Sequence, residues 1–340
     1  MLKKKIALTL AALLVLGALG GCGNTESTST TTEPKETQTA EEAKVMKILT
    51  LGSSSSVDAC HMLNLVAAAE GAPEELVIGT LYYSGCTLTQ HVEFLTKNSA
   101  VYQLYLSSTS KPNSPPTVMD EVTMQMALRY DCWDIIFLQG GGIETMEDVA
   151  FTNGNIETIK KYVNEQKLNP EMVFGYHAIG INSTDKDLVG MYPYSPNPYA
   201  TEAAKWGYDR TRMYAERIDR LQRFVETDTD YQYRIYSITT VENAITSYLG
   251  EKGIKRDYTH LTDLGRLAAA YSIYCELYGI EELKEIKVDA IPKAFLKSTA
   301  NKAVDLEITD GEKAVILEAV NNTLKNPMQI TPSQYTQAPA

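Results

Sequence analysis

The 340 residues are 44% hydrophobic and 22% charged, which is the balance of an ordinary globular protein with a real core. Because 31 Lys and Arg face 43 Asp and Glu, the formal net charge is -12. A nucleic-acid partner is therefore not expected, since a phosphate backbone requires clustered cations.

The N-terminus has the pattern of a lipoprotein signal peptide, expected over residues 1–21. A basic start precedes an apolar run from Ile6 to Leu19 that is too short to span a membrane comfortably. The run ends in Leu19-Gly20-Gly21-Cys22, which resembles a bacterial lipobox. This resemblance implies export, with the mature chain anchored by a lipid on Cys22 at the outer face of the bacterial cytoplasmic membrane. An uncleaved anchor, or a secretory signal with an incidental cysteine, is the alternative.

Residues 22–44 contain Ser, Thr and Glu with almost no apolar side chain. Such a segment cannot bury enough surface to offset its ordering entropy, so we predict a disordered tether. The remaining cysteines form no C-x-x-C pair and have no companion histidine spacing, so we interpret them as buried thiols, with disulfides left open: Cys60, Cys86, Cys132 and Cys275. We expect no metal and no cofactor.

Five apolar runs alternate with helical patterns over residues 45–280, which we expect to be one domain. The predicted strands are Val45–Leu51, Leu76–Tyr83, Trp133–Leu138, Met172–Tyr176 and Tyr233–Ile238. The alternation predicts a three-layer α/β/α sandwich around a central parallel sheet of about five strands. Ligands of such sheets bind beyond the carboxyl ends of the strands, so polar residues there are candidate site residues.

Helical spacing and loop composition organise the rest of the chain. The predicted helices include Val57–Ala69, Thr201–Val225 and Leu261–Tyr278. Proline-rich stretches at Ser107–Pro116 and Tyr192–Trp206 predict surface loops. Residues 281–340 are expected to be a C-terminal extension, partly helical to Leu324 and then a frayed tail.

A serine and a histidine from opposite ends of the domain are the best candidates for chemistry. A hydroxyl needs a base within hydrogen-bond reach, an acid that orients the base, and donors for the developing oxyanion. Ser54 lies in a four-serine run after the first strand, at the start of a helix whose free N–H groups favour negative charge. Among the four histidines, His260 has the best neighbour, because Asp257 lies three residues before it in a loop ahead of a helix. A helix cap at the serines and a chance Asp-x-x-His turn are the alternatives, and Ser55 or Ser56 remains open as the nucleophile.

These motifs resemble those of the SGNH/GDSL hydrolases. Lys47–Asp58 is especially similar to a subgroup of uncharacterised bacterial SGNH-like proteins with Gly-Asn-Ser-Phe-Ser in this block, where Ser53 and Ser55 here replace Asn and Phe. The likeness continues through Tyr83–Leu88, Trp133–Gln139 and Arg256–Arg266, and so covers about Val45 to Tyr278. It implies a flavodoxin-like SGNH hydrolase fold and a triad of Ser54, His260 and Asp257.

The resemblance also implies an oxyanion hole. Its donors would be the backbone N–H groups of Ser54 and Gly85 and a side-chain amide after the third strand. The family has Gly-x-Asn-Asp there, whereas this chain has Leu138-Gln139-Gly140-Gly141-Gly142. We therefore predict Gln139 as the third donor, because its amide donates in the same way.

Other polar and aromatic residues carry weaker signals. His177, just after the fourth strand, is a candidate substrate contact or else a satisfied core histidine. His61 and His91 have the spacing of packing residues, and Asp58 is expected to be structural at a helix start. The chain has 21 Tyr against 6 Phe, and loop aromatics that either line a glycan groove or pin the loop to its domain are Tyr192, Tyr194, Tyr199 and Trp206.

The sequence therefore favours a cell-surface carboxylic ester hydrolase that removes acetyl or other short acyl groups from carbohydrate, or cleaves a small ester, through an acyl-enzyme on Ser54. A glycan-binding lipoprotein that keeps the fold without turnover is one alternative. A lipase-like enzyme acting on long acyl chains is another. No Gly-x-Ser-x-Gly elbow surrounds Ser54, and no His-Glu-x-x-His or phosphate-loop motif occurs, which disfavours those enzyme classes.

Overall fold

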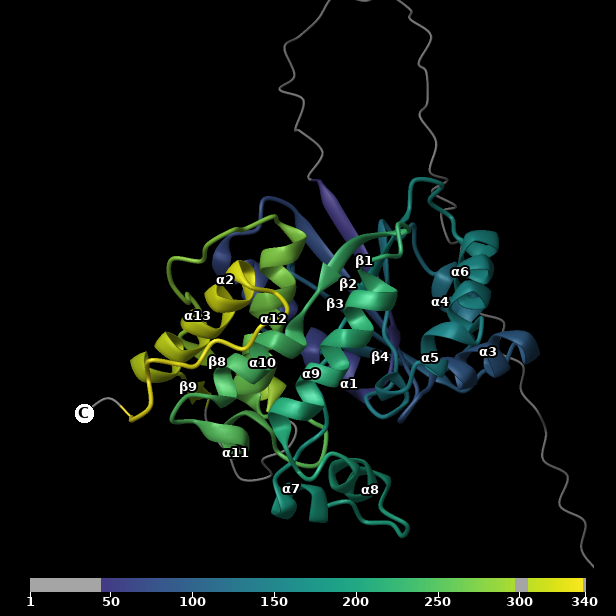
Figure 1. Ribbon diagram of the computed structural model, residues 1–340. Coiled ribbons are helices and arrows are strands. Elements are labelled where there is room, and N and C mark those ends of the chain that lie inside the picture. Colours follow the sequence, from purple (N-terminus) through teal and green to yellow (C-terminus); the bar gives the residue numbers. More distant parts are fainter. Residues whose placement is uncertain (1–43, 297–304, 339–340) are drawn as a thin grey trace, which may run out of the picture. The chain divides into compact units, whose positions relative to one another are not determined.

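The predicted apolar runs form the middle of a seven-stranded sheet in a computed structural model (Figure 1). The structure describes residues 44–296 and 305–338. The predicted signal peptide, Cys22 and all but the last residue of the predicted tether lie outside these residues. The strands are β1 Val45–Gly52, β2 Glu75–Tyr82, β3 Tyr102–Ser108, β4 Thr117–Val122, β5 Ile135–Leu138, β6 Val173–His177 and β7 Tyr231–Ile235.

The sheet is mostly parallel, with the order β4-β3-β2-β1-β5-β6-β7. The five predicted strands are the parallel ones, which confirms the α/β fold class. The other two, β3 and β4, were not predicted and extend one edge in antiparallel pairing. The last predicted strand was placed too late in the chain, because a helix already begins at Ser237.

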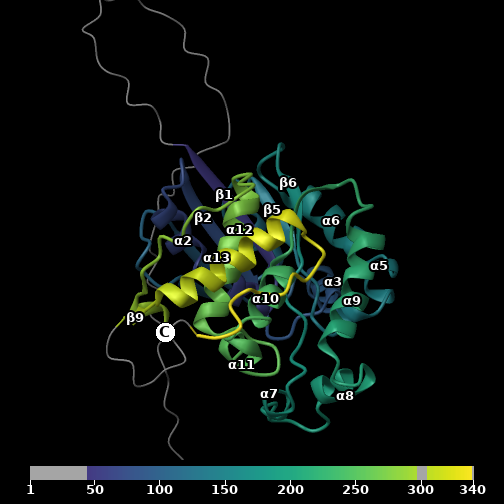
Figure 2. The ribbon, with the colours of Figure 1, turned by 60° about the vertical axis from the view of Figure 1, so that its left-hand side comes forward.

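Helices cover both faces of the sheet (Figures 1 and 2). One face carries α1 Ser54–Cys60, α2 Leu63–Glu70, α10 Ser237–Ile245, α12 Asp263–Leu277 and α13 Asp310–Lys325. The other carries α3 Leu88–Lys97, α4 Met124–Leu128, α5 Val149–Thr152, α6 Asn155–Gln166 and α9 Arg210–Arg220. Successive side chains of β1 alternate between the two cores, with Ile48 on the first face and Leu49 and Leu51 on the second.

Shorter elements connect these layers. They are the α-helices α7 Lys186–Gly190, α8 Pro198–Lys205 and α11 Gly250–Ile254, the 3-10 helices η1 Glu144–Met146 and η3 Lys293–Phe295, the π-helix η2 Leu221–Val225, and the antiparallel strands β8 Ala290–Ile291 and β9 Leu306–Glu307. The predicted loop from Tyr192 to Trp206 thus contains α8. Asn197 begins it, because its side chain accepts hydrogen bonds from the backbone N–H groups of Tyr199 and Ala200. Three buried cysteines are free thiols: Cys60, Cys86 and Cys275.

The C-terminal extension packs against the domain. Its main helix, α13, begins with a capping box between Thr309 and Glu312 and lies across α10 and α12 (Figure 2). The segment after α13 was predicted to fray, but it returns along α10. There the backbone N–H of Thr331 donates to Asn243 Oδ1 at 2.8 Å, and the N–H of Tyr248 donates to the Tyr335 carbonyl at 2.8 Å.

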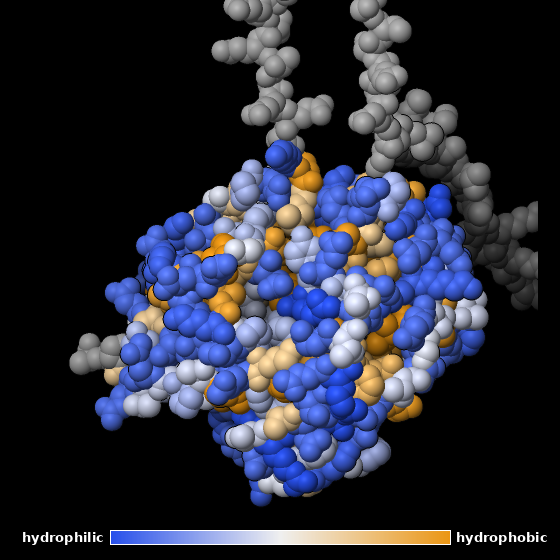
Figure 3. Space-filling view, turned by 45° about the horizontal axis from the view of Figure 1, so that its top comes forward, coloured by the Kyte–Doolittle hydropathy of each residue, from blue (hydrophilic) through white to orange (hydrophobic). Residues whose placement is uncertain are grey.

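One face of the described domain is largely polar. On the face drawn in Figure 3, hydrophilic residues predominate and hydrophobic ones form small patches between them. Within residues 44–296 and 305–338, none of the helices has both the length and the apolar content needed to cross a bilayer.

Candidate functional site

The first strand ends where the sheet topology favours a ligand site. The connections leave β1 toward β2 on one side and reach β5 on the other, so the carboxyl end of β1 is a switch point of the sheet. Gly52 ends the strand. A Cβ at Gly52 would collide with the Ser56 hydroxyl and lie 2.5 Å from Gln139 Oε1. Glycine therefore allows α1 to begin at once, with Ser54 as its first residue.

Three residues predicted to act together do meet at this point. Ser54 Oγ lies 2.9 Å from His260 Nε2. On the other side of the imidazole, Nδ1 lies 2.9 Å from Asp257 Oδ2 and 3.0 Å from Oδ1. The side chains of His260 and Asp257 are 17% and 18% exposed, so a ligand can approach them. This is the arrangement of a nucleophile, a base and an orienting acid.

The carboxylate of Asp257 fixes the protonation pattern of this triad. Burial would raise the pKa of Asp257, but hydrogen bonds from the His260 ring and from the backbone N–H groups of His260 and Thr259 outweigh it. The pKa is therefore held well below its usual range. An ionised carboxylate accepts the hydrogen on Nδ1, which leaves Nε2 as the acceptor for the Ser54 hydroxyl.

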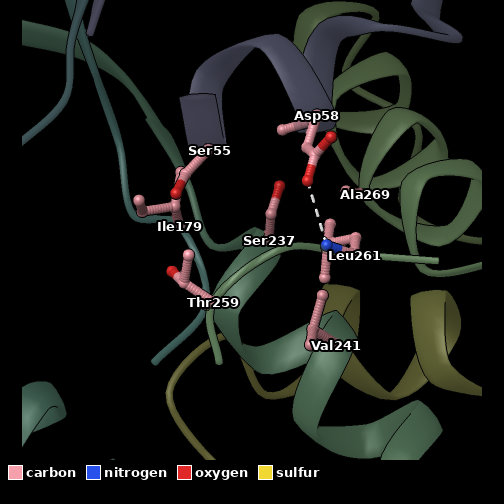
Figure 4. A pocket seen from close by; sticks show the side chains of 10 residues that line it. Ser55, Asp58, Ile179, Ser237, Val241, Thr259, Leu261 and Ala269 are labelled. Atoms are coloured by element: carbon pink, nitrogen blue, oxygen red, sulfur yellow. Dashed lines mark hydrogen bonds between the residues drawn. The ribbon is translucent and has the colours of Figure 1, made fainter. Parts of the chain in front are cut away.

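The other three serines of the run have different surroundings. Ser53 precedes α1, and its side chain makes no capping hydrogen bond. The Ser56 hydroxyl is buried and donates to Gln139 Oε1. Ser55 lines an internal cavity together with Ile179 and others (Figure 4). Ser54 is thus the serine whose hydroxyl faces the imidazole.

The cavity beside Ser55 is small. It is formed between α1, the loop that carries Thr259 and the start of α10, where Ser237 lines it (Figure 4). Its volume of about 10 Å³ is close to that of one water molecule. The cavity is therefore too small to hold an ester substrate.

Asp58 links α1 to the loop that carries His260. The sequence predicted only a structural role for it at the helix start. Its carboxylate is 4% exposed. One oxygen accepts the backbone N–H of Leu261 at 3.0 Å, and the other accepts Arg266 Nε at 2.9 Å. Arg256 contacts the same carboxylate and donates to the Leu261 carbonyl. The backbone on the far side of His260 is therefore held to α1.

The predicted oxyanion donors are only partly brought together. Gly85 is exposed and has a φ of 62° in the turn after β2, the neighbour of β1. Its turn meets the glycine loop after β5, because a Cβ at Gly141 would lie 3.5 Å from the Cys86 carbonyl. Gln139, however, is 1% exposed, and its amide donates to the Gly140 carbonyl while Oε1 accepts the Ser53 N–H. The prediction of Gln139 as the third oxyanion donor is wrong, because its amide is buried and already donates to the Gly140 carbonyl.

His177 does not contact the outer side of the site. It is 1% exposed, and its Nε2 lies 2.9 Å from the Ser237 hydroxyl. Burial lowers the pKa of His177 to about 4, so the ring is neutral. His177 is therefore a satisfied core histidine, and its prediction as a substrate contact is wrong. His61 and His91 are buried too.

The predicted aromatic residues divide into two groups. Tyr192 contacts both Tyr194 and Tyr199, and the rings of Tyr192 and Tyr199 also meet Tyr258, two residues before His260. Trp206 is 7% exposed and donates to Glu202 Oε1 at 2.6 Å, so it belongs to the core.

One buried amide near the site was missed by the sequence. Asn182 is 1% exposed, and within the described ranges neither its Nδ2 nor its Oδ1 has a hydrogen-bond partner. A Cβ on Gly142 would lie 3.0 Å from its Oδ1. The next residue, Ser183, donates its backbone N–H to the Tyr258 carbonyl at 2.8 Å. Nothing in the local sequence marks this asparagine.

No metal site accompanies the triad in the part of the chain that the structure describes. There, no three His, Cys, Asp or Glu side chains are grouped so as to hold a metal ion.

Comparisons with known proteins identify a family. A crystal structure of a DUF4886 family protein from Bacteroides uniformis ATCC 8492 has a TM-score of 0.68 and 21% identity, covering 86% of this chain and 100% of that one, which shows a shared fold. A "putative SGNH hydrolase" from Slackia heliotrinireducens has a TM-score of 0.38 and 15% identity over 69% of this chain and 100% of that one, too low to carry an argument. None of the curated proteins matches. Residues 47–303, most of the chain, match the model of a family described as a domain of unknown function, and the chain therefore belongs to the DUF4886 family.

Proposed function

We propose that this chain is a serine ester hydrolase of the SGNH/GDSL type that removes acetyl or other short acyl groups. One observation carries the proposal. The Ser54 hydroxyl lies 2.9 Å from His260 Nε2, while Nδ1 of the same ring meets the ionised carboxylate of Asp257. Acyl transfer to water is the reaction that this arrangement performs.

The proposed reaction has two steps. Ser54 Oγ attacks the ester carbonyl carbon as its proton moves to His260 Nε2, and the tetrahedral intermediate then collapses. The ester C–O bond breaks, the departing alcohol oxygen takes the proton from Nε2, and an acyl-enzyme remains on Ser54. Water next attacks the acyl carbon and gives a proton to Nε2, which returns it to Ser54 Oγ as the carboxylic acid leaves.

The oxyanion of both intermediates would be stabilised by backbone N–H groups. Ser54 begins α1 after β1, and Gly85 lies in the turn after β2, two strands that pair in parallel. These two positions therefore support an oxyanion hole between the carboxyl ends of β1 and β2. A lost donor of this kind costs about 3 kcal/mol of transition-state stabilisation.

We propose acylated carbohydrate at the cell surface as the substrate. Support comes from the polar face of the domain in Figure 3 and from Tyr258, whose ring contacts that of His260. The lipobox-like Leu19–Cys22 supports export and a lipid on Cys22. Cys22→Ser is expected to shift the chain from the membrane fraction to the soluble fraction, and unchanged fractionation would contradict the anchor.

A binding protein without turnover is the second candidate. The Gln139 side chain favours this candidate, because its amide group is hydrogen-bonded to buried groups. Gln139 therefore does not supply the third oxyanion-hole donor that the SGNH/GDSL resemblance implies. Such a protein would hold an acylated glycan in the same place without breaking the ester.

Labelling of the full chain with a fluorophosphonate separates these two functions. The wild type is expected to bind one equivalent and to hydrolyse aryl acetates, and Ser54→Ala is expected to do neither. Ser55→Ala is the matched control, because it removes the neighbouring hydroxyl, which lines the internal cavity. A wild type that resists the label and leaves aryl acetates intact would favour the binder. Faster hydrolysis of long-chain aryl esters than of acetates would favour a lipase.

A further inference from the structure

Four tyrosines form a continuous cluster that starts at the catalytic imidazole. The Tyr258 ring centroid lies 5.8 Å from that of His260, 4.3 Å from Tyr199 and 5.0 Å from Tyr192. Tyr194 continues the series at 5.6 Å from Tyr192 and is 71% exposed. The rings thus lead from the base to the surface.

The segment that carries three of these rings is held in place. Tyr192 and Tyr194 lie between α7 and α8, and Tyr199 lies in the first turn of α8. Figures 1 and 2 place these two helices together at the lower edge, opposite the start of β1. Asn197 donates from Nδ2 to the Val189 carbonyl at 2.9 Å and caps α8 with its side-chain oxygen. The rings are therefore presented on a fixed segment.

The chemistry of the triad decides which half of an ester meets this cluster. His260 returns its proton to the departing alcohol oxygen, so the alcohol has to lie on the side of the imidazole. The carbonyl oxygen has to lie near the Ser54 and Gly85 N–H groups. Gly85 follows β2 and the tyrosine segment follows β6, and these strands lie on opposite sides of β1. The sheet order therefore separates the acyl side from the alcohol side.

We propose that Tyr192, Tyr194, Tyr199 and Tyr258 form a subsite that binds a sugar ring of the leaving alcohol, which makes O-acylated carbohydrate the substrate class. This inference rests on the proposed esterase function. A tyrosine ring offers an apolar face to the C–H face of a pyranose and a hydroxyl at its edge for the sugar hydroxyls. The partly buried rings nearest His260 receive the acylated sugar, and Tyr194 receives the next one.

The experiment compares two acetate esters that differ only in the alcohol. For the wild-type full chain, kcat/KM for O-acetylated xylobiose is expected to exceed that for methyl acetate. Tyr194→Ala should lower the first about tenfold and leave the second unchanged, because one stacking contact is lost. Tyr194→Phe should keep most of the activity. Tyr130→Ala is the matched control, since Tyr130 is 50% exposed and stacks on Trp133, away from this cluster.

The acyl-enzyme gives a second readout. The alcohol has left before water attacks, so the rate at which the acetyl-enzyme hydrolyses should be the same in Tyr194→Ala and in the wild type. The subsite is overturned if Tyr194→Ala changes neither ester or both alike, or if the wild type does not prefer the acetylated sugar, while hydrolysis still depends on Ser54. Hydrolysis that survives Ser54→Ala, or none with either ester, overturns the proposed function itself.

Discussion

The carboxylate of Asp58 accepts a hydrogen bond from the backbone N–H of Leu261, the residue that follows His260. Asp58 lies one turn after Ser54 in α1, so one side chain connects the helix of Ser54 to the loop of His260. The same carboxylate pairs with Arg256 and Arg266, and the side chains of Asp58 and Arg266 are 4% and 8% exposed. The distance between Ser54 and His260 thus depends on a buried ionic group.

Replacing Asp58 by Asn is expected to lower kcat about tenfold, because the loop that carries His260 is loosened. KM should change little, because Asp58 is buried and does not contact the substrate. The unfolding free energy should fall by about 3 kcal/mol, since two arginines lose a buried partner. Asp263→Asn is the control, because Asp263 contacts Arg266 Nη1 at 3.3 Å on the outer part of the same network. Ester kinetics and urea unfolding of both variants check this, and equal losses of kcat would show that Asp58 acts through the fold alone.

Asp257→Asn is expected to reduce kcat by a factor on the order of 10⁴. An amide cannot accept and orient the Nδ1 hydrogen as the carboxylate does, so the imidazole takes the wrong tautomer. Because the folded-state pKa of Asp257 is lowered, the carboxylate stabilises the fold above its ordinary pKa of about 3.9, and this contribution is lost as the pH falls below that value. Kinetics at pH 7 check the activity, and a loss of less than tenfold would speak against the triad.

The parallel strands and the Asp257–His260 pair were predictable because each depends on local sequence. Val45–Leu51 is a continuous apolar run, and a strand buried on both faces requires such a run. Asp257 and His260 are three residues apart, so one turn brings them together wherever the loop lies. The meeting of His260 with Ser54 followed from the family resemblance, and the spacing of either motif alone did not establish it.

The features that were missed depend on distant neighbours. Gln139 was predicted as an oxyanion donor, yet its orientation is set by Ser53 and Ser56, which reach it from the end of another strand. The added strands β3 and β4 have mixed polar and apolar residues, because they are partly exposed, and so they lacked the signal of the buried strands. The packing of the last residues on α10 depends on Asn243, which lies nearly ninety residues before them.

Gln139 and Asn182 are buried amides after neighbouring strands, and they are expected to respond oppositely to substitution by Leu. Gln139→Leu should destabilise the fold by about 2 kcal/mol, because the Ser53 N–H and the Ser56 hydroxyl lose their acceptor. Asn182→Leu should be neutral or stabilise by about 1 kcal/mol, since its amide has no partner among the described residues. Urea unfolding measures both, and a large loss in Asn182→Leu would reveal a buried water or ligand on that amide.

The buried histidines are expected to make the fold sensitive to mild acid. His91 is 1% exposed with Nδ1 2.8 Å from the Tyr102 hydroxyl, and His177 is 1% exposed against Ser237. Burial lowers the pKa of each ring to about 4 from an ordinary 6.5. Between these two values the unfolded chain binds a proton that the folded chain does not, so stability falls as the pH falls through this window. Each ring contributes up to about 3 kcal/mol to that loss.

His177→Gln tests this separately from the carboxylates, which titrate equally in the variant and in the wild type. The variant should be less stable than the wild type at pH 7.5, because the contact with Ser237 is weakened. Its stability should nevertheless fall less steeply between pH 6.5 and pH 4.5, because one buried ring no longer resists protonation. Urea midpoints measured across this range give the two slopes, and parallel slopes would mean that His177 accepts a proton in the folded chain.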